Sequence, residues 1–226
     1  MAPLASAPVA LCLFAKPPRP GRSKTRLAAA LGETGAARLA DAFVRDAWVK
    51  IAAIAWARPV LATTDARDPV WRALGCTDVW PQGAGDLGRR MERVLRRALE
   101  SHPSAIAVGT DVPALPRSRF DCARDALASH DAVLGPSEDG GFYLIGLRRC
   151  PSGLLSGIAW STGEARAQTI DRLHSAGLTV ALLSSGFDVD RPADVDRLRA
   201  MGDDLSETAP ETVRALRDLD GRGQDL

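Results

Sequence analysis

The stretch that decides the fold reads Val9-Ala-Leu-Cys-Leu-Phe-Ala-Lys16 and continues as Pro17-Pro-Arg-Pro-Gly-Arg-Ser-Lys-Thr-Arg-Leu27. Its first half is an apolar run typical of a buried strand. Its second half is a turn rich in proline and glycine that leads into an alanine-rich helical segment. Unpaired backbone N–H groups at such a helix N-terminus favour negative charge. The turn also carries five cations, which favour a di- or triphosphate, although a solvated basic turn is the alternative. These cations are Lys16, Arg19, Arg22, Lys24 and Arg26.

Length and composition indicate one globular domain. The chain has 226 residues, of which 46% are hydrophobic and 25% charged, enough for an α/β domain with a full core. The formal net charge of +1 argues against a general nucleic-acid binder. A cluster of arginines in residues 87–99 fits a solvated helix face better than a nucleic-acid stripe. Its members are Arg89, Arg90, Arg93, Arg96 and Arg97.

The cysteines and the N-terminus predict a cytoplasmic location. The four cysteines lie far apart without a CxxC pair, which favours buried, reduced thiols. The first 15 residues lack the basic start and the cleavage site of a signal peptide. The chain contains no apolar run of about 18 residues, the length that a membrane span requires. The three scattered histidines give little support for a zinc site or a histidine-based triad.

Strand and helix patterns alternate along most of the chain. This alternation predicts a single α/β domain with a mostly parallel sheet covered on both faces. The expected domain spans residues 9–220, between a flexible N-terminus at 1–8 and a tail at 221–226. Strands are expected at 9–16, 59–65, 77–80, 105–113, 131–136, 141–147 and 178–183, and helices at 32–56, 70–74, 87–99, 118–129, 164–176, 192–201 and 211–219.

Charged residues follow several of these expected strands. Ligands of open parallel sheets bind beyond the carboxyl ends of the strands, where such side chains meet. Asp111 and Asp190 each stand two residues before a proline, and Asp188 competes with Asp190 as a second ligand. Mg²⁺ or Mn²⁺ needs only one or two carboxylates when phosphates complete its shell. The residues alone are equally compatible with turn and helix-cap roles for these aspartates.

Two stretches of the sequence are similar to known phosphate-binding motifs, but neither is a strong match. Gly21-Arg-Ser-Lys-Thr25 is similar to the end of a Walker A motif, but Ser23 replaces the required glycine and Pro18 stands at the first glycine position. Gly83-Ala-Gly-Asp-Leu-Gly88 satisfies GxGxxG, but it follows a weak strand in mid-chain, and Asp86 would face a pyrophosphate. A P-loop and a nicotinamide or flavin site are therefore weakly supported.

Several blocks in order resemble a bacterial family of glycosyltransferase-like proteins, often called arsenosugar-biosynthesis glycosyltransferases. This family belongs to the nucleotide-diphospho-sugar transferase superfamily, so the resemblance implies a GT-A-type three-layer sandwich. The same layout is similar to the guanylyltransferases of deazaflavin-cofactor synthesis and to molybdopterin nucleotidyltransferases. The resemblance covers about residues 9–200. The blocks are Phe14–Leu27, Gly85–Met91, Gly109–Leu115, Gly135–Gly146, Trp160–Thr162 and Asp188–Asp194.

The resemblance also implies roles for individual residues. The catalytic groups would be Lys24, Arg26 and Asp139, and the metal would be held by Asp111 with Asp190 or Asp188. Asp139 or Glu138 would orient or deprotonate the acceptor. The late motif more usually reads Asp-Thr-Pro, so the role of Arg191 stays open. The nucleotide would contact Phe14, Ala15, Lys16, Gly21, Arg22, Lys24, Arg26, Thr64, Gly83, Gly85 and Asp86, and the acceptor Glu138, Asp139, Gly140, Gly141, Phe142, Trp160, Ser161 and Thr162.

Three functions remain open at this point. The leading hypothesis is glycosyl transfer from a nucleotide sugar to a small acceptor, with Mg²⁺ or Mn²⁺ as cofactor. The alternative is nucleotidyl transfer, in which an acceptor phosphate attacks a nucleoside triphosphate and pyrophosphate leaves. A further alternative is a nucleotide-binding protein without catalysis. The expected partners are small molecules rather than nucleic acid or membrane, and a homodimer is left open.

Overall fold

A central sheet organises the molecule, which is a computed structural model that describes residues 8–222. Within these residues the sheet has seven strands in the order β3-β2-β1-β4-β6-β5-β7. In this described part, β6 alone runs antiparallel to its neighbours. The sheet thus confirms the predicted single-domain α/β fold with a mostly parallel mixed sheet. The strands are β1 Val9–Ala15, β2 Ala57–Thr63, β3 Val79–Pro81, β4 Ala105–Gly109, β5 Ala132–Pro136, β6 Phe142–Leu147 and β7 Val180–Leu182.

The apolar run of β1 lies near the middle of the sheet. It pairs in parallel with β2 on one side and β4 on the other. All of its residues except Phe14 are buried, as expected for a strand whose two faces are both covered. After β1 the chain adds β2 and β3 on one side of β1, and it then crosses back to place β4 on the other side of β1. A ligand crevice is expected at this reversal of strand order, beyond the carboxyl ends of β1 and β4.

Helices cover both faces of the sheet. Leu11 and Leu13 of β1 pack in one cluster with side chains of α1 and α4. Ala10 and Cys12 belong to a second cluster, with side chains of α3 and α5. The alternation of β1 side chains between these clusters builds the three layers. The helices are α1 Ala28–Ala52, α2 Pro69–Ala73, α3 Leu87–Leu99, α4 Ser118–Ala126, α5 Ala165–Ser175, α6 Pro192–Ala200, α7 Asp203–Thr208 and α8 Pro210–Arg222, with the short 3-10 turn η1 at Thr25–Leu27.

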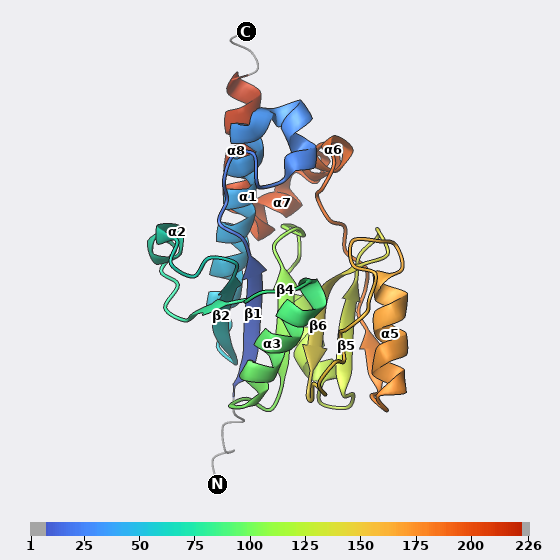
Figure 1. The fold of residues 1–226 in the computed structure, drawn as a ribbon. Helices are drawn as coiled ribbons and strands as arrows, with labels where there is room; N and C mark the ends of the chain where they lie inside the picture. The colour runs from blue at the N-terminus through green and yellow to red at the C-terminus, as the bar shows by residue number, and fades with distance from the viewer. Residues whose placement is uncertain (1–7, 223–226) are drawn as a thin grey trace.

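A third apolar cluster joins the first part of α1 to the last helices of the chain. Leu27 and Phe43 pack in it with side chains of α6, α7 and α8. Figure 1 shows these helices gathered beside α1, at the end of the molecule toward which β1 points. Asp46 of α1 is buried and accepts hydrogen bonds from the Thr212 amide and hydroxyl, at 2.8 and 2.6 Å. This contact fixes the start of α8 on α1.

Some boundaries differ from the predictions. The long first helix begins at Ala28, and Gly32 (φ 68°, ψ 162°) kinks it. The helix α7 was not expected, because its stretch contains one apolar side chain, Leu205, which is buried. The strand β4 ends at Gly109 rather than near residue 113. Helix α8 includes residues 221 and 222, and the predicted flexible N-terminus and the rest of the tail lie, apart from Pro8, outside the described residues.

The cysteines and the membrane prediction can be compared with the structure directly. All four cysteines are free thiols. Cys12 is buried in β1, but Cys122 is exposed on α4, so the expectation of buried thiols was wrong for this residue. Among residues 8–222, none of the helices has the length and apolar character needed to cross a membrane.

Candidate active site

A cavity of about 670 Å³ opens at the carboxyl ends of β1 and β4. Its walls come from the loops after β1, β4 and β5, from the starts of α3 and β6, from α1, and from residues 160–162, Asp188 and Asp190. Cationic and acidic side chains from distant parts of the sequence therefore meet in one space. The charged residues that line it are Lys16, Arg22, Lys24, Arg26, Arg90, Asp111, Asp139, Asp188 and Asp190.

The ammonium group of Lys24 joins the two signs of charge. Its Nζ lies 2.6 Å from Asp111 Oδ1 and 2.8 Å from Asp190 Oδ1, and the Lys24 side chain is only 8% exposed. Burial by itself lowers the pKa of Lys24, but the two carboxylates more than offset it, so this pKa lies above its ordinary value. Lys24 is therefore a charged ammonium held inside the cavity wall. Nearby, Arg26 Nη1 lies 3.8 Å from Asp190 Oδ2.

Main-chain contacts bring the two carboxylates together. Asp190 stands eight residues beyond β7, and the segment between them returns to the end of β4. There the amide of Val189 donates to the carbonyl of Asp111 at 2.9 Å. In the first turn of α6, Asp194 accepts from the amides of Asp190 and Arg191, at 2.9 and 2.7 Å. These bonds fix the backbone of both carboxylate-bearing segments.

The loop that carries Asp111 is also held from behind. Lys50 of α1 donates from Nζ to the carbonyl oxygens of Pro113 and Leu115, at 3.1 and 2.5 Å. Burial lowers the pKa of Lys50 to about 8, against a smaller opposite effect of Asp46. Lys50 thus positions the Asp111 loop without reaching the cavity, whose lining does not include it.

Asp188 lies deeper than the other acidic groups. Burial, with a smaller contribution from the nearby carboxylates of Asp139, Asp111 and Asp190, raises its pKa to about 7 against the opposing effect of a hydrogen bond with Ser137. Lys24 contacts Asp111 and Asp190 rather than Asp188. The Asp188 carboxyl is therefore partly protonated near neutral pH and adds less negative charge to the cavity than an ordinary aspartate would.

The loop after β5 directs one of its two acidic side chains into the cavity. Asp139 Oδ1 accepts hydrogen bonds from the Ser137 hydroxyl at 2.7 Å and from the Gly141 amide at 2.9 Å. Gly140 has a φ of 88°, and a Cβ there would lie 2.2 Å from the carbonyl oxygen of Gly163, so glycine is needed for this close approach. Glu138 instead pairs with Arg197 of α6, at 2.6 and 2.9 Å, and does not line the cavity.

Aromatic and strained residues also line the cavity. Phe142 and Trp160 meet edge to face, with ring centroids 6.0 Å apart and planes at 73°. Ser161, the residue after Trp160, has a φ of 64°, and Lys24 has a φ of 48°. Within the described chain these are the non-glycine residues with positive φ, and both line the cavity. Such backbone strain is concentrated at functional sites.

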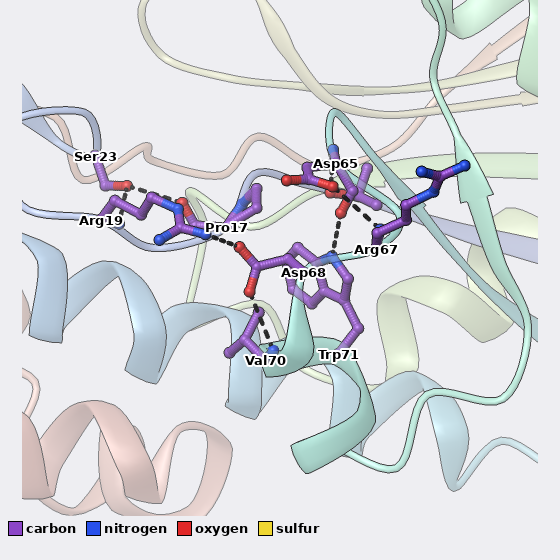
Figure 2. Close-up of polar contacts among 9 residues, drawn as sticks. Pro17, Arg19, Ser23, Asp65, Arg67, Asp68, Val70 and Trp71 are labelled. Carbon is purple, nitrogen blue, oxygen red and sulfur yellow. Dashed lines mark hydrogen bonds and ion pairs between the residues drawn. The ribbon is translucent and has the colours of Figure 1, made fainter.

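One of the five cations after β1 turns away from the cavity. Figure 2 shows Arg19 paired with Asp68, whose other oxygen accepts from the Val70 amide at 3.1 Å and so caps α2. Ser23 Oγ accepts from the Arg19 amide at 3.0 Å, which closes the turn. Arg19 therefore anchors the loop to α2, which agrees with its absence from the predicted nucleotide contacts. The other four line the cavity.

The glycine-containing loop after β3 satisfies its own polar groups. Arg93 donates to the carbonyl oxygens of Gln82 and Ala84, and Asp86 Oδ1 caps α3 by accepting from the Arg89 amide at 2.8 Å. The predicted nucleotide residues Gly83, Gly85 and Asp86 do not line the cavity, and neither do Gly21, Thr64 and Gly140. Those that the structure does bring to it are Phe14, Ala15, Lys16, Arg22, Lys24 and Arg26.

The arginines of α3 form the largely exposed helix face that was predicted, since four of the five are exposed and Arg90 is half-buried. Two of the exposed ones also make structural contacts, because Arg93 holds the preceding loop and Arg97 stacks on the ring of Trp80 at 3.9 Å. Arg90 lines the cavity beside Gln82, whose Oε1 lies 3.4 Å from Arg90 Nη1. Sequence reasoning missed both of these lining residues. The signal for Arg90 is its position three residues after Leu87, which puts them on one face of α3.

The carboxylates of Asp111 and Asp190 suit a divalent cation whose remaining ligands are not protein side chains. Asp111 and Asp190 already place one oxygen each within 2.8 Å of a single cationic atom, Lys24 Nζ. In the part of the chain that the structure describes, no three metal-ligating side chains are grouped closely enough to hold a metal by themselves. Mg²⁺ and Mn²⁺ commonly bind through one or two carboxylates, with water and phosphate oxygens as the remaining ligands. The donor set therefore suits a metal that arrives with a phosphorylated ligand.

The fold, with this cavity beyond the carboxyl ends of its strands, is the GT-A-like fold of the nucleotide-diphospho-sugar transferase superfamily. A solved structure of a provisionally assigned nucleotide-diphospho-sugar transferase from Desulfovibrio desulfuricans G20 is 29% identical, with a TM-score of 0.85 over 94% of this chain and 95% of that one. More distantly, 4-diphosphocytidyl-2C-methyl-D-erythritol synthase from Anaerococcus prevotii DSM 20548 is 8% identical (TM-score 0.57, 86% and 96% covered). Glucosyl-3-phosphoglycerate synthase from Mycobacterium tuberculosis, solved with Mg²⁺ and UDP, is 13% identical (TM-score 0.51, 91% and 80% covered). These two share the fold.

The particular family is a bacterial one. The chain belongs to the family described as "Uncharacterized protein conserved in bacteria" (DUF2064), whose model matches residues 48–162. The match includes Asp111 and Asp139, but the loop after β1 and Asp190 lie outside it. No curated protein matches the sequence. The resemblance to the arsenosugar and deazaflavin enzymes stays a prediction.

Proposed function

We propose that this protein is a divalent-metal-dependent transferase that passes a glycosyl group from a nucleotide sugar to a small acceptor. One observation carries the proposal. The loop cation Lys24 meets the carboxylates of Asp111 and Asp190 inside a cavity at the carboxyl ends of β1 and β4. A phosphate chain needs cations on one side, a hard metal needs carboxylates on the other, and this cavity supplies both.

The cationic side would hold the phosphates of the donor. Lys16, Arg22 and Arg26 line the cavity together with Lys24. Positive groups placed before the reaction stabilise charge that develops on a leaving diphosphate. When bound at Asp111 and Asp190, Mg²⁺ or Mn²⁺ would neutralise part of the same charge. The contacts of Lys24 favour Asp190 over Asp188 as the second carboxylate.

The acceptor would enter on the side of Asp139 and the aromatic pair. Oδ1 of Asp139 is occupied by the Ser137 hydroxyl and the Gly141 amide. Among residues 8–222 no hydrogen bond to its Oδ2 is formed, so this oxygen can accept one from an acceptor hydroxyl. A carboxylate in that position can orient the hydroxyl and take its proton as the bond to the sugar forms. Phe142 and Trp160 provide an apolar wall for the acceptor or the sugar.

The charges of the cavity favour a diphosphate leaving group. Lys24 is already neutralised by two carboxylates, and Arg26 lies near one of them, so the uncompensated positive charge is smaller than the sequence suggests. The 29% identical structure is also described as a sugar-nucleotide transferase. Nucleotidyl transfer is the second candidate, because four cations of one loop line the cavity and could hold a triphosphate.

The released product distinguishes these reactions. The protein is incubated with nucleotide sugars and, separately, with nucleoside triphosphates, in each case with Mg²⁺ or Mn²⁺ and a panel of small hydroxylated and phosphorylated acceptors. We expect release of nucleoside diphosphate from a nucleotide sugar, and none from the variant Asp111→Asn. Release of pyrophosphate from a triphosphate would replace this proposal with nucleotidyl transfer. A rise in melting temperature with nucleotide, without either product, would leave only a binding function.

A further inference from the structure

Lys24 has an unusual place for a residue expected to hold phosphate. Its backbone is in the left-handed region, with φ 48° and ψ 45°, although lysine has no special tolerance for it. Its side chain is 8% exposed and its Nζ lies 5.7 Å from the centre of the Phe43 ring. Both of its close ionic contacts are the carboxylates that fit the metal. The strained backbone therefore directs this ammonium to the carboxylates rather than into open space.

An ammonium and a divalent cation cannot share this position. Lys24 Nζ contacts Oδ1 of Asp111 and Oδ1 of Asp190 at 2.6 and 2.8 Å, distances typical of direct charge-assisted bonds. A metal ion that bound the same two oxygens would lie within a few ångströms of the ammonium if Lys24 did not move. Repulsion between a divalent and a monovalent cation this close together is strong in the partly buried environment of the cavity wall. Metal binding at these carboxylates therefore requires Lys24 to leave them.

We propose that Lys24 is an internal counter-ion that occupies the place of the divalent cation in the free protein and passes to the donor phosphates when the metal binds. This inference rests on the proposed function, because it takes Asp111 and Asp190 as the metal carboxylates. The released ammonium is on the same loop as Lys16 and Arg22, which line the cavity and form no ion pair among residues 8–222, and as Arg26, whose Nη1 lies 3.8 Å from Asp190 Oδ2. Metal binding thus creates part of the phosphate site, and phosphate binding holds Lys24 away from the metal.

The coupling has a thermodynamic consequence. A ligand that favours one of two positions of Lys24 raises the affinity for any other ligand that favours the same position, and the effect is reciprocal. The metal and a diphosphate should therefore bind more tightly together than separately. Without the lysine, the metal alone should bind more tightly, because it no longer displaces a resident cation.

The test measures Mn²⁺ binding without nucleotide, by electron paramagnetic resonance of the free ion. We expect the variant Lys24→Met to bind Mn²⁺ about tenfold more tightly than the wild type. The matched control is Arg22→Met, which removes one cation from the same loop and cavity. Among the described residues its side chain forms no ion pair, so we expect a change of less than about threefold, the weak effect of a screened charge. Lys24→Asn is the second variant, because asparagine tolerates the left-handed backbone.

The outcomes separate this inference from the function on which it rests. Suppose that both Lys24 variants fold and bind Mn²⁺ with an affinity that is lower than that of the wild type or within about threefold of it. This result would overturn the counter-ion role and leave the metal site intact. Absence of Mn²⁺ binding in all forms, with inorganic pyrophosphate present as well as absent, would overturn both. A second readout uses the wild type, in which pyrophosphate should tighten Mn²⁺ binding by a larger factor than it does in Lys24→Met.

Discussion

Two loops at the same edge of the sheet contain the features of a phosphate site, and only one of them points its charges into the cavity. The loop after β1 sends Lys24 to carboxylates that are distant in the sequence, and leaves Lys16, Arg22 and Arg26 along the cavity wall. The loop after β3 contains the GxGxxG pattern, but Arg93 and Asp86 satisfy its backbone internally. The difference indicates that the polar groups of a motif are available to a ligand only where the fold does not satisfy them within the same loop.

The largest expected effect is on the side of the loop after β1. Asp111→Asn preserves shape but removes a carboxylate that faces Lys24 and the metal. We expect metal-dependent nucleotide affinity to fall by about 100-fold, measured by calorimetry with and without Mn²⁺. The control is Asp86→Asn in the loop after β3, where asparagine caps a helix as well as aspartate does. Equal losses in the two variants would contradict the contrast between the loops.

A second prediction tests whether the loop after β3 is structural. Arg93→Met removes donors to the carbonyl oxygens of Gln82 and Ala84. We expect the free energy of unfolding to fall by about 2 kcal/mol. Hydrogen bonds to charged groups contribute about 1.5–3 kcal/mol, and the two bonds of Arg93 are partly exposed. Denaturant titration measures the loss, with exposed Arg89→Met on the same helix as the control. A large loss of nucleotide affinity in Arg93→Met without loss of stability would instead make this loop part of the binding site.

A third prediction compares two cations within the loop after β1. Arg26 lines the cavity, whereas Arg19 pairs with Asp68 at the start of α2. We expect Arg26→Met to weaken nucleotide binding about tenfold, and Arg19→Met to weaken it less than threefold. Binding assays at one fixed salt concentration measure both. If Arg19→Met had the larger effect, the loop would have to rearrange on binding so that Arg19 faces the nucleotide.

The smallest expected effect concerns Lys50, which holds the Asp111 loop much as Arg93 holds its own. Burial lowers the pKa of Lys50 to about 8 in the folded protein, while in the unfolded chain it stays near 10.4. Between these values the unfolded chain binds more protons, so stability from this group rises with pH. Between pH 8 and pH 9, the free energy of unfolding of the wild type should rise by about 1 kcal/mol relative to that of Lys50→Met. Denaturant titrations at both pH values measure the gain, and parallel pH profiles would show that Lys50 keeps its ordinary pKa.

The sequence predicted the elements better than it predicted their partners. The strand β1 was readable because an unbroken apolar run ends in a proline-rich turn, and most helices showed a periodic apolar face. Helix α7 was missed because a single buried side chain, Leu205, gives no periodicity. The site required contacts between residues that are far apart, such as Lys24 and Asp190, which are separated by 166 positions. Motif spacing could place both at one edge of the sheet but could not show that they touch.

The same limit applies to individual cations. Arg19 and Arg93 look like their neighbours in the sequence, but each is held by an acceptor that the fold brings to it. For Arg19 this acceptor is the side chain of Asp68, and for Arg93 it is the main chain of its own loop. Local composition therefore predicts where charge is concentrated, while tertiary structure decides which charges remain available to a ligand.

The central claim is that the loop after β1 and the carboxylates of Asp111 and Asp190 hold a phosphate chain and a metal between them. The most direct test is a crystal structure grown with Mn²⁺ and the nucleoside diphosphate that most raises the melting temperature, with anomalous scattering to locate the metal. We predict a Mn²⁺ peak bonded to Asp111 and Asp190, with Lys24 and Arg26 on the phosphates. A nucleotide bound at the loop after β3, or Lys24 still paired with both carboxylates beside a bound nucleotide, would contradict this account.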